Sequence, residues 1–245
     1  MRELSAAELL EVWERSSARS PTERALTVLS AANRSIESEA LAAMSIGRRD
    51  ELLLSVRESV FGPQLMAIVD CPECRQQLEF SVNVDELRIS NSEIGPPAPI
   101  VLAVDGYEIS FRLPDSRDLI AAGAAGDIES ARKTLLERCL LAARNDSSEV
   151  STDRLPKEII ETVEQEMSRR DAQANVQLEL TCPSCQREWT AAFDILSFFW
   201  SELDAWAQRL LVEVHKLASA YGWREGDILE MSAVRRNIYL NMVSG

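Results

Sequence analysis

Histidine is almost absent from the chain, with one residue, His215, among 245. Ser/His/Asp and Cys/His catalysis would both depend on this single side chain. It falls on the polar flank of an expected long helix, which is typical of a solvated surface histidine. We therefore expect no Ser/His/Asp or Cys/His catalytic site in this protein.

Long hydrophobic runs are also absent, and basic residues are in the minority. The longest apolar stretches are far too short to span a bilayer, and the N-terminal Met1-Arg2-Glu3-Leu4-Ser5 leads into an acidic amphipathic segment rather than a signal peptide. The 26 Lys and Arg against 40 Asp and Glu give a net charge of −14, which repels nucleic acid and anionic lipid. These features predict a cytoplasmic protein whose partners include neither nucleic acid nor membrane.

Cysteine is scarce, but its placement is informative. Four of the five cysteines lie in two short blocks, Cys71-Pro-Glu-Cys74 and Cys182-Pro-Ser-Cys185. Because one block offers two thiolates and a structural Zn²⁺ takes four ligands, we expect Cys71, Cys74, Cys182 and Cys185 to form one Cys₄ zinc site. The 107 residues between the blocks should then form an inserted unit.

Two other uses of these blocks are less favoured. A redox CxxC opens a helix in a βαβ setting, whereas both blocks here lead into alternating, strand-like sequence. A catalytic zinc keeps an open position and uses His or carboxylate ligands. The fifth cysteine, Cys139, lies on an apolar helical face and is interpreted as a small core residue.

Helical signals dominate both ends of the chain. Capping boxes begin at Ser5 and Ser20, a third helix is expected over Ile46–Phe61, and a long one over Ile195–Tyr221 is followed by two shorter helices. Around the cysteine blocks the period changes to that of strands, so each block is read as strand, turn, strand in an internal repeat that buries Phe80 and Trp189.

The segment between the repeats is expected to be mixed. A Ser/Pro/Gly-rich loop over Ser90–Pro99 precedes strands over Ile100–Val104 and Tyr107–Leu113. Helices are then predicted over Pro114–Ala122, Asp127–Ala143 and Pro156–Arg170.

The sequence thus predicts an α+β protein that is mainly helical, with a split Cys₄ zinc ribbon and an α+β insert. We expect a helical lobe over residues 1–65, a first zinc-knuckle hairpin over 66–90, the insert over 91–175, a second hairpin over 176–194, and the long helix with two short ones over 195–245.

Aromatic residues are concentrated near the C-terminus, where nine of the 14 lie between Trp189 and Tyr239. Such side chains fill cores, and they also dominate binding hot spots. We expect most of them to be core, with an exposed edge around residues 223–236. The candidate partner-binding residues are Trp200, Trp223, Arg235, Arg236 and Tyr239.

Several segments carry a resemblance to a known family. They include Trp200-Ser-Glu-Leu-Asp-Ala-Trp206, Tyr221-Gly-Trp-Arg-Glu225, Phe61-Gly-Pro63, both cysteine blocks and Leu136-Glu-Arg-Cys139-Leu. In their order and surroundings, these segments resemble the baseplate hub assembly proteins of T-even-type phages. Relatives described as hub assembly chaperones also accompany phage-tail-like contractile injection systems.

The resemblance implies an assembly factor or chaperone that binds baseplate hub or spike proteins and carries no catalytic residues, so we expect no enzyme and no small-molecule substrate. One alternative is a permanent structural subunit of the baseplate hub. A third, a zinc-dependent enzyme, would require a non-cysteine ligand or an open metal position.

Overall fold

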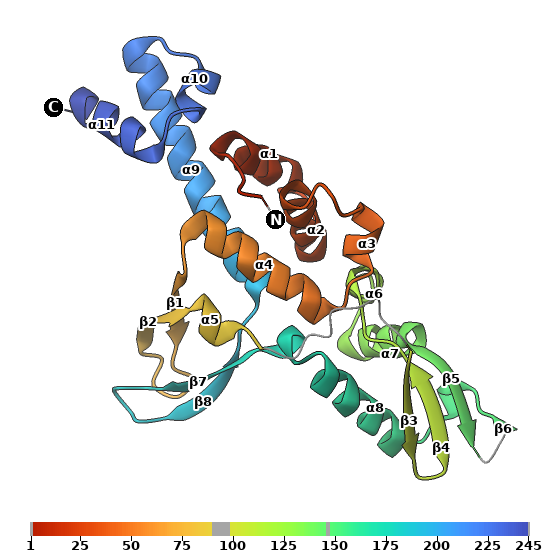
Figure 1. The fold of residues 1–245 in the computed structure, drawn as a ribbon. Helices are drawn as coiled ribbons and strands as arrows, with labels where there is room; N and C mark the ends of the chain where they lie inside the picture. The colour runs from red at the N-terminus through yellow and green to blue at the C-terminus, as the bar shows by residue number, and fades with distance from the viewer. Residues whose placement is uncertain (1, 90–98, 146–147, 245) are drawn as a thin grey trace. The chain divides into compact units, whose positions relative to one another are not determined.

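The structure, a computed structural model, describes residues 2–89, 99–145 and 148–244. The chain forms two compact units, one from its two ends, up to Ser35 and from Leu196 onward, and one from Ile36–Ile195. Helices predominate and the sheets are small and antiparallel (Figure 1). The expected mixed, mainly helical class is confirmed, while the five-segment division stays a prediction. The loop expected over Ser90–Pro99 falls largely outside the described residues.

The unit formed by the chain ends is helical. Its elements are α1 (Ala6–Ser16), α2 (Pro21–Ala32), α9 (Ile195–Tyr221), α10 (Glu225–Leu229) and α11 (Ala233–Ser244). Both predicted capping boxes are present, because Ser5 and Ser20 each exchange hydrogen bonds with the glutamate three residues later. A core of Leu210, Val214 and Leu217 from α9 packs with Ile228 from α10.

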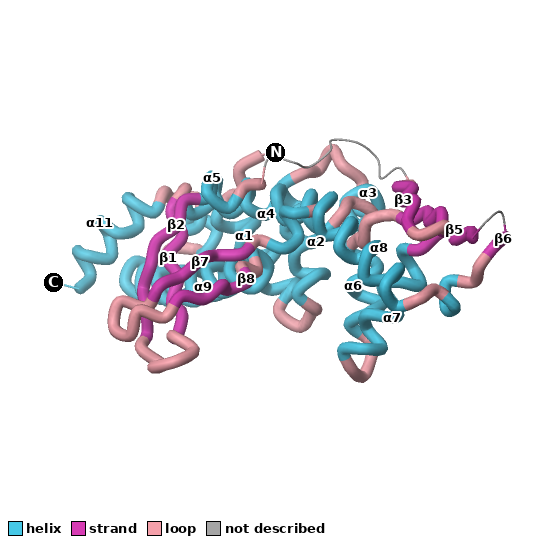
Figure 2. Tube along the Cα trace, turned by 90° about the horizontal axis from the view of Figure 1, so that it is seen from below, coloured by secondary structure: helices cyan, strands magenta, loops and turns pink. Residues whose placement is uncertain are grey.

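The unit formed by residues 36–195 carries all the strands that the structure describes. It begins with α3 (Ser38–Ala42) and α4 (Ile46–Phe61), followed by the hairpin β1 (Gln64–Asp70) and β2 (Gln77–Asn83), and α5 (Val84–Leu87). After the insert's sheet come α8 (Lys157–Arg170), the 3₁₀ turn η2 (Ala172–Asn175), and the hairpin β7 (Gln177–Thr181) and β8 (Glu188–Ala192). The two hairpins lie side by side in both views (Figures 1 and 2).

The insert is built on a four-stranded antiparallel sheet. Its order is β3 (Ile100–Val104), β4 (Tyr107–Phe111), β5 (Leu140–Asn145) and β6 (Ser148–Glu149). Between β4 and β5 run α6 (Ser116–Gly123) and α7 (Ile128–Cys139), and the short 3₁₀ turn η1 (Thr152–Arg154) precedes α8. Ile109, Phe111, Cys139, Ile159 and Val163 pack together in the core that joins this sheet to α8.

One predicted helix is wrong over its last four residues. The alanine-rich run Asp127–Ala143 was expected to be helical throughout, but α7 ends at Cys139 and the next residues form β5. Leu140 pairs with Phe111 and Ala143 with Ile109, and both Leu140 and Ala143 are buried in the insert core. Pairing with β4 therefore overrides the local helix propensity.

A buried carboxylate, Asp118, fastens the insert's helices to its sheet. Its oxygens accept from Arg112 at 2.9 Å, from Arg138 at 2.8 Å and from the Asp115 N–H at 3.0 Å. Burial alone would raise the pKa of Asp118, but the hydrogen bonds from Arg112, Asp115 and Arg138 outweigh it and lower the pKa to about 2.

The replacement Asp118→Asn should lower the free energy of unfolding by about 2 kcal/mol at pH 7, because the ionised form is stabilised only in the folded protein. This stabilisation is complete above the unfolded pKa, near 4, and is lost as the pH falls toward 2. Urea unfolding across pH 2–7 should show this loss in the parent and not in the variant. Asp85→Asn, at an exposed ion pair with Arg88, is the control and should change little. Parallel pH curves for parent and Asp118→Asn would contradict the assignment.

Two polar side chains, Asp171 and Gln173, join the segment that precedes β7 to the segments that flank the first cysteine hairpin. The carboxylate of Asp171 accepts from the Ser45 hydroxyl at 3.0 Å and from the Gly47 N–H at 2.9 Å, so it caps the start of α4. The buried amide of Gln173 donates to Leu87 O at 3.1 Å and accepts from Ile89 N–H at 2.7 Å. Gln173 lies just before β7 and Leu87 lies just after β2, so this amide joins the chain next to the two hairpins. Asp171 instead joins η2 to the start of α4, at the opposite end of that 16-residue helix from β1.

Gly47 permits the close approach of Asp171. A Cβ atom at residue 47 would lie 2.3 Å from Asp171 Oδ1 and 2.9 Å from Ala174 N. We expect Gly47→Ala to lower the free energy of unfolding by about 2 kcal/mol, because displacement of a buried cap outweighs the gain of about 1 kcal/mol in helix propensity.

Chemical denaturation measures this effect. The control is Gly123→Ala in α6, where an added Cβ meets nothing within 4 Å. It should leave stability unchanged or raise it by up to about 1 kcal/mol. Equal effects of the two substitutions would rule out the proposed role of Asp171.

Candidate metal centre

The two cysteine blocks form the same backbone turn. In the first, Arg75 N–H donates to Cys71 O at 2.9 Å, and Cys71 N–H donates to Gln76 O at 2.9 Å. The amide of the first cysteine and its carbonyl thus both take part in closing the turn. Each block links the two strands of its hairpin, β1 to β2 and β7 to β8.

The second turn repeats these bonds at equivalent positions. Gln186 N–H donates to Cys182 O and Cys182 N–H to Arg187 O, both at 2.9 Å. The residue after the second cysteine adopts a left-handed conformation in each turn, with φ of 58° at Arg75 and 59° at Gln186. Non-glycine residues adopt this conformation infrequently, so its presence at the same position of both turns marks a shared backbone structure. The repeat expected from the sequence is therefore present in the backbone.

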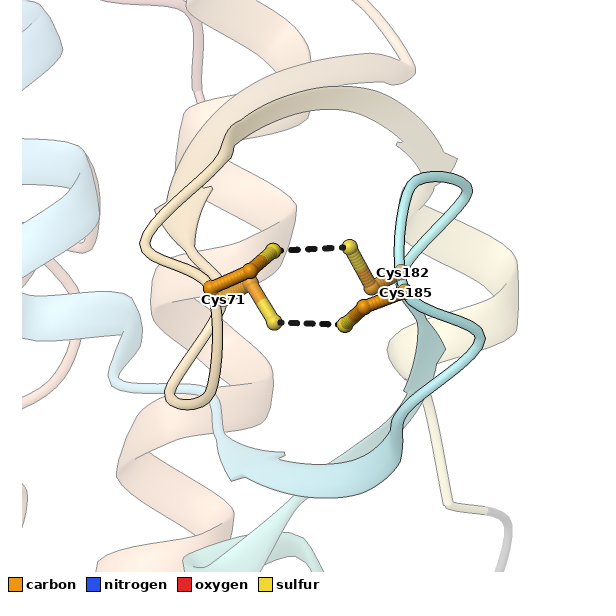
Figure 3. Close-up of side chains that lie close together, drawn as sticks. Cys71, Cys182 and Cys185 are labelled. Atoms are coloured by element: carbon orange, nitrogen blue, oxygen red, sulfur yellow. Dashed lines mark hydrogen bonds between the residues drawn. The ribbon is translucent and has the colours of Figure 1, made fainter.

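The four cysteine sulfurs converge on one point (Figure 3). Cys71 Sγ lies 3.7 Å from Cys185 Sγ, and Cys74 Sγ lies 3.6 Å from Cys182 Sγ. All four sulfurs lie within 4.8 Å of one another. A tetrahedron of Zn–S bonds near 2.3 Å has edges of roughly 3.8 Å, so the cluster has the dimensions of a Cys₄ zinc site. These separations are well beyond a disulfide bond of about 2.05 Å.

The two cysteines of each turn differ in exposure. Cys71 and Cys182, the first of each pair, are buried, whereas Cys74 and Cys185 are exposed. Phe80 and Trp189, which were expected to be buried near the site, are half-buried. The centre is thus enclosed on the side of the hairpins and reachable by solvent at the tips of the turns.

The sulfurs cannot all be ionised at neutral pH without a cation. Backbone N–H groups of Cys185 and Ser184, together with the neighbouring thiols, lower the pKa of Cys182 to about 6. The Arg187 N–H lowers the pKa of Cys185, but desolvation and the other cysteines outweigh it and raise the pKa to about 12. One cysteine is therefore readily ionised, and its negative charge makes ionisation of the next cysteine less favourable. A dication such as Zn²⁺ would remove this repulsion, and the donor set fits it.

The remaining cysteine has different surroundings. Cys139 is buried in the insert core, with its Sγ 3.8 Å from Asp118 Oδ2. Burial and the adjacent Asp118 carboxylate raise the pKa of Cys139 to about 12. A thiol of this kind is unreactive at neutral pH, in agreement with the expected core role.

The candidate partner-binding residues lie in two places on the helical unit that the two chain ends form. Trp200 is on α9 under the guanidinium of Arg24, at 4.4 Å from ring centroid to Cζ. Trp223 stacks on Tyr221 at 4.5 Å and meets Tyr239 edge-on at 4.8 Å. Their capacity to bind a partner stays a prediction.

The two neighbouring arginines have different surroundings. Arg235 is exposed and lies 5.8 Å from the Tyr239 ring centroid. Arg236 is only 5% exposed, and it donates to Glu213 at 3.0 Å and to Met231 O at 2.7 Å. The geometry thus gives Arg236 the role of tying α11 to α9.

Sequence reasoning missed the polar residues that join the segments on either side of the insert. Asp171 and Gln173 lie in a polar stretch with no motif, and Gly47 resembles any other helical glycine. The one usable signal was Ser45, the N-cap residue of α4. Its hydroxyl oxygen accepts a hydrogen bond from the N–H of Arg48, three residues later. The tertiary partner Asp171 lies 126 residues away from Ser45 and leaves no local pattern.

Comparison with known proteins identifies one family. A model of the family described as T4 bacteriophage base plate protein matches residues 6–200, a range that includes both cysteine turns and ends within α9. No curated protein and no solved structure matches the chain. In the described part of the chain, no helix is both long and apolar enough to cross a membrane.

Cys185→Ser tests the metal centre directly. The parent should carry one zinc per chain, and the variant should bind it at least about a hundredfold more weakly, because a thiolate ligand is lost. Metal analysis and competition with a chromogenic chelator measure both. The matched control is Ser184→Ala in the same turn, which removes an exposed hydroxyl and keeps all four sulfurs. Equal zinc affinity of the parent and Cys185→Ser would refute the site.

Proposed function

Because the chain belongs to the T4 bacteriophage base plate protein family, we propose that it is a non-catalytic assembly factor, or chaperone, of the baseplate hub. The observation that carries the proposal is the family match over residues 6–200, most of the chain. The host structure is a contractile phage tail or a phage-tail-like injection system. The protein acts by binding hub or spike proteins until the next subunit replaces it.

In this proposal the metal is structural zinc. Cys71, Cys74, Cys182 and Cys185 would supply all four ligands of a tetrahedral ion, which leaves no position for substrate or water. The ion would fasten two hairpins that belong to distant parts of the chain. A zinc-dependent enzyme, the third possibility, needs a non-cysteine ligand or an open position, and a metal bound by four sulfurs argues against it.

An apolar face on α11 supports a role in protein binding. Val234, Ile238 and Met242 are 71%, 50% and 65% exposed, and their spacing of four residues puts them on one face of the helix. We call these three side chains the α11 stripe. Exposed apolar surface of this kind marks interaction sites in soluble proteins. The stripe is a candidate contact for a hub or spike subunit.

The alternative is a permanent structural subunit of the hub, for which the same surfaces would serve. Mature particles separate the two roles, because an assembly factor is absent or substoichiometric there and a subunit is present in fixed copy number. In the assembly role the protein works in the cytoplasm, and the net charge of −14 argues against nucleic acid as its partner.

Replacing the α11 stripe should weaken client capture without unfolding the protein. The triple variant Val234→Ser, Ile238→Ser and Met242→Ser changes side chains that are mostly in solvent, so stability should change by less than about 1 kcal/mol. The variant and the parent are each co-expressed with the hub and spike proteins of the same phage tail or injection system and affinity-purified. The variant should recover at least about tenfold less client than the parent.

The matched control is Val212→Ser on α9, a side chain that is 53% exposed and outside the stripe. It should retain client capture at the parent level. If the stripe variant recovers as much client as the parent, the stripe is not the contact. If the parent itself recovers none of the hub or spike proteins, the assembly proposal fails.

A further inference from the structure

A cavity of about 450 Å³ lies between the end of α1, the start of α2 and the first turns of α9. Its lining combines the indoles of Trp13 and Trp200 with Arg24 and Asp204. The exposed Ser201 is among the residues at its rim, so solvent reaches it. The volume is in the range of sites that hold small ligands or a few residues of peptide.

Backbone carbonyls, rather than a carboxylate, hold Arg24 in the cavity wall. Its Nε donates to Ser16 O at 3.1 Å and its Nη2 to Ser17 O at 2.7 Å, so the last carbonyls of α1 fix its orientation. Its guanidinium lies over the Trp200 ring at 4.4 Å. Among the described residues, no carboxylate forms an ion pair with Arg24, and its Nη1 makes no hydrogen bond.

The carboxylate in the same cavity is already engaged. One oxygen of Asp204 accepts from the Trp13 indole N–H at 2.8 Å, and the other accepts from Gln208 at 2.8 Å. The indole N–H of Trp200, by contrast, has no hydrogen-bond partner within the described residues. The cavity therefore offers a ligand one fixed cation, an indole donor and two aromatic surfaces.

We propose that this cavity binds a short extended segment of a baseplate partner that places an Asp or Glu carboxylate beside an aromatic or aliphatic side chain. The carboxylate pairs with Arg24, and the apolar side chain packs against Trp13 and Trp200. Arg and Trp are the residues that contribute most to protein-binding hot spots, and the unpaired cation selects for an acidic segment. The inference rests on the proposed function, because it gives that function a peptide ligand and a site.

The test uses the full-length protein labelled with ¹⁵N at its tryptophan indoles. The probe is a capped synthetic peptide containing Asp-Asp-Phe-Leu, compared with the same peptide containing Asn-Asn-Phe-Leu. The acidic peptide should shift the indole signals of Trp13 and Trp200 and leave those of Trp206 and Trp223 in place. The amide peptide should bind at least about tenfold more weakly, because it loses the charge-assisted hydrogen bond.

Variants separate binding from folding. Arg24→Gln should weaken the acidic peptide about tenfold, whereas Arg24→Lys, which keeps the charge, should retain part of the affinity. Arg209→Gln on α9 removes an exposed charge outside the cavity and should bind as the parent does. Thermal unfolding midpoints identify any variant that does not fold. For such a variant, the comparison of the acidic and amide peptides binding to the parent protein tests the inference instead.

Several results would overturn the inference. Equal affinity for the acidic and amide peptides, or shifts at Trp206 and Trp223 instead, would place binding elsewhere. Movement of the Trp13 and Trp200 signals on raising the protein concentration alone would mean that a second copy of the chain occupies the cavity. If the acidic peptide does not bind but the protein still captures hub or spike proteins, only this inference is wrong. If the peptide binds but no hub or spike protein is captured, only the client assignment is wrong.

Discussion

The convergence of four cysteine sulfurs from two distant turns is the constraint on which the rest of the structure depends. Sulfurs 3.6–3.7 Å apart cannot all ionise beside one another, so the arrangement is satisfied by a dication or by keeping protons on the thiols. Bringing them together closes a loop of more than a hundred residues, which costs chain entropy. The metal proposed here would supply the free energy that offsets this cost.

The same loop is closed a second time at the other end of the hairpins. Asp171 caps α4 through Ser45 and Gly47, and Gln173 bonds the backbone after α5. Because Gln173 lies just before β7 and Leu87 just after β2, the Gln173 contacts at the base and the sulfurs at the tips restrain the same pair of hairpins.

The sequence was most informative where the signal is local. The capping residues Ser5 and Ser20 predicted two helix starts, and the change of period around the cysteines predicted the two hairpins. It was uninformative where one segment depends on a distant one. Leu140–Ala143 has the composition of a helix and becomes a strand because β4 offers an edge, and the pairing of Arg24 with Trp200 joins residues far apart in sequence. The meeting of the cysteine pairs was predictable only because metal chemistry demands four ligands.

The chain belongs to the T4 bacteriophage base plate protein family, and its four cysteine sulfurs converge on one point. The central claim is that the two turns share one ion. X-ray absorption at the zinc edge of the full-length purified protein tests this most directly. The account predicts four sulfur neighbours at about 2.3 Å. Nitrogen or oxygen ligands in the first shell, or a folded protein that contains no zinc, would contradict it.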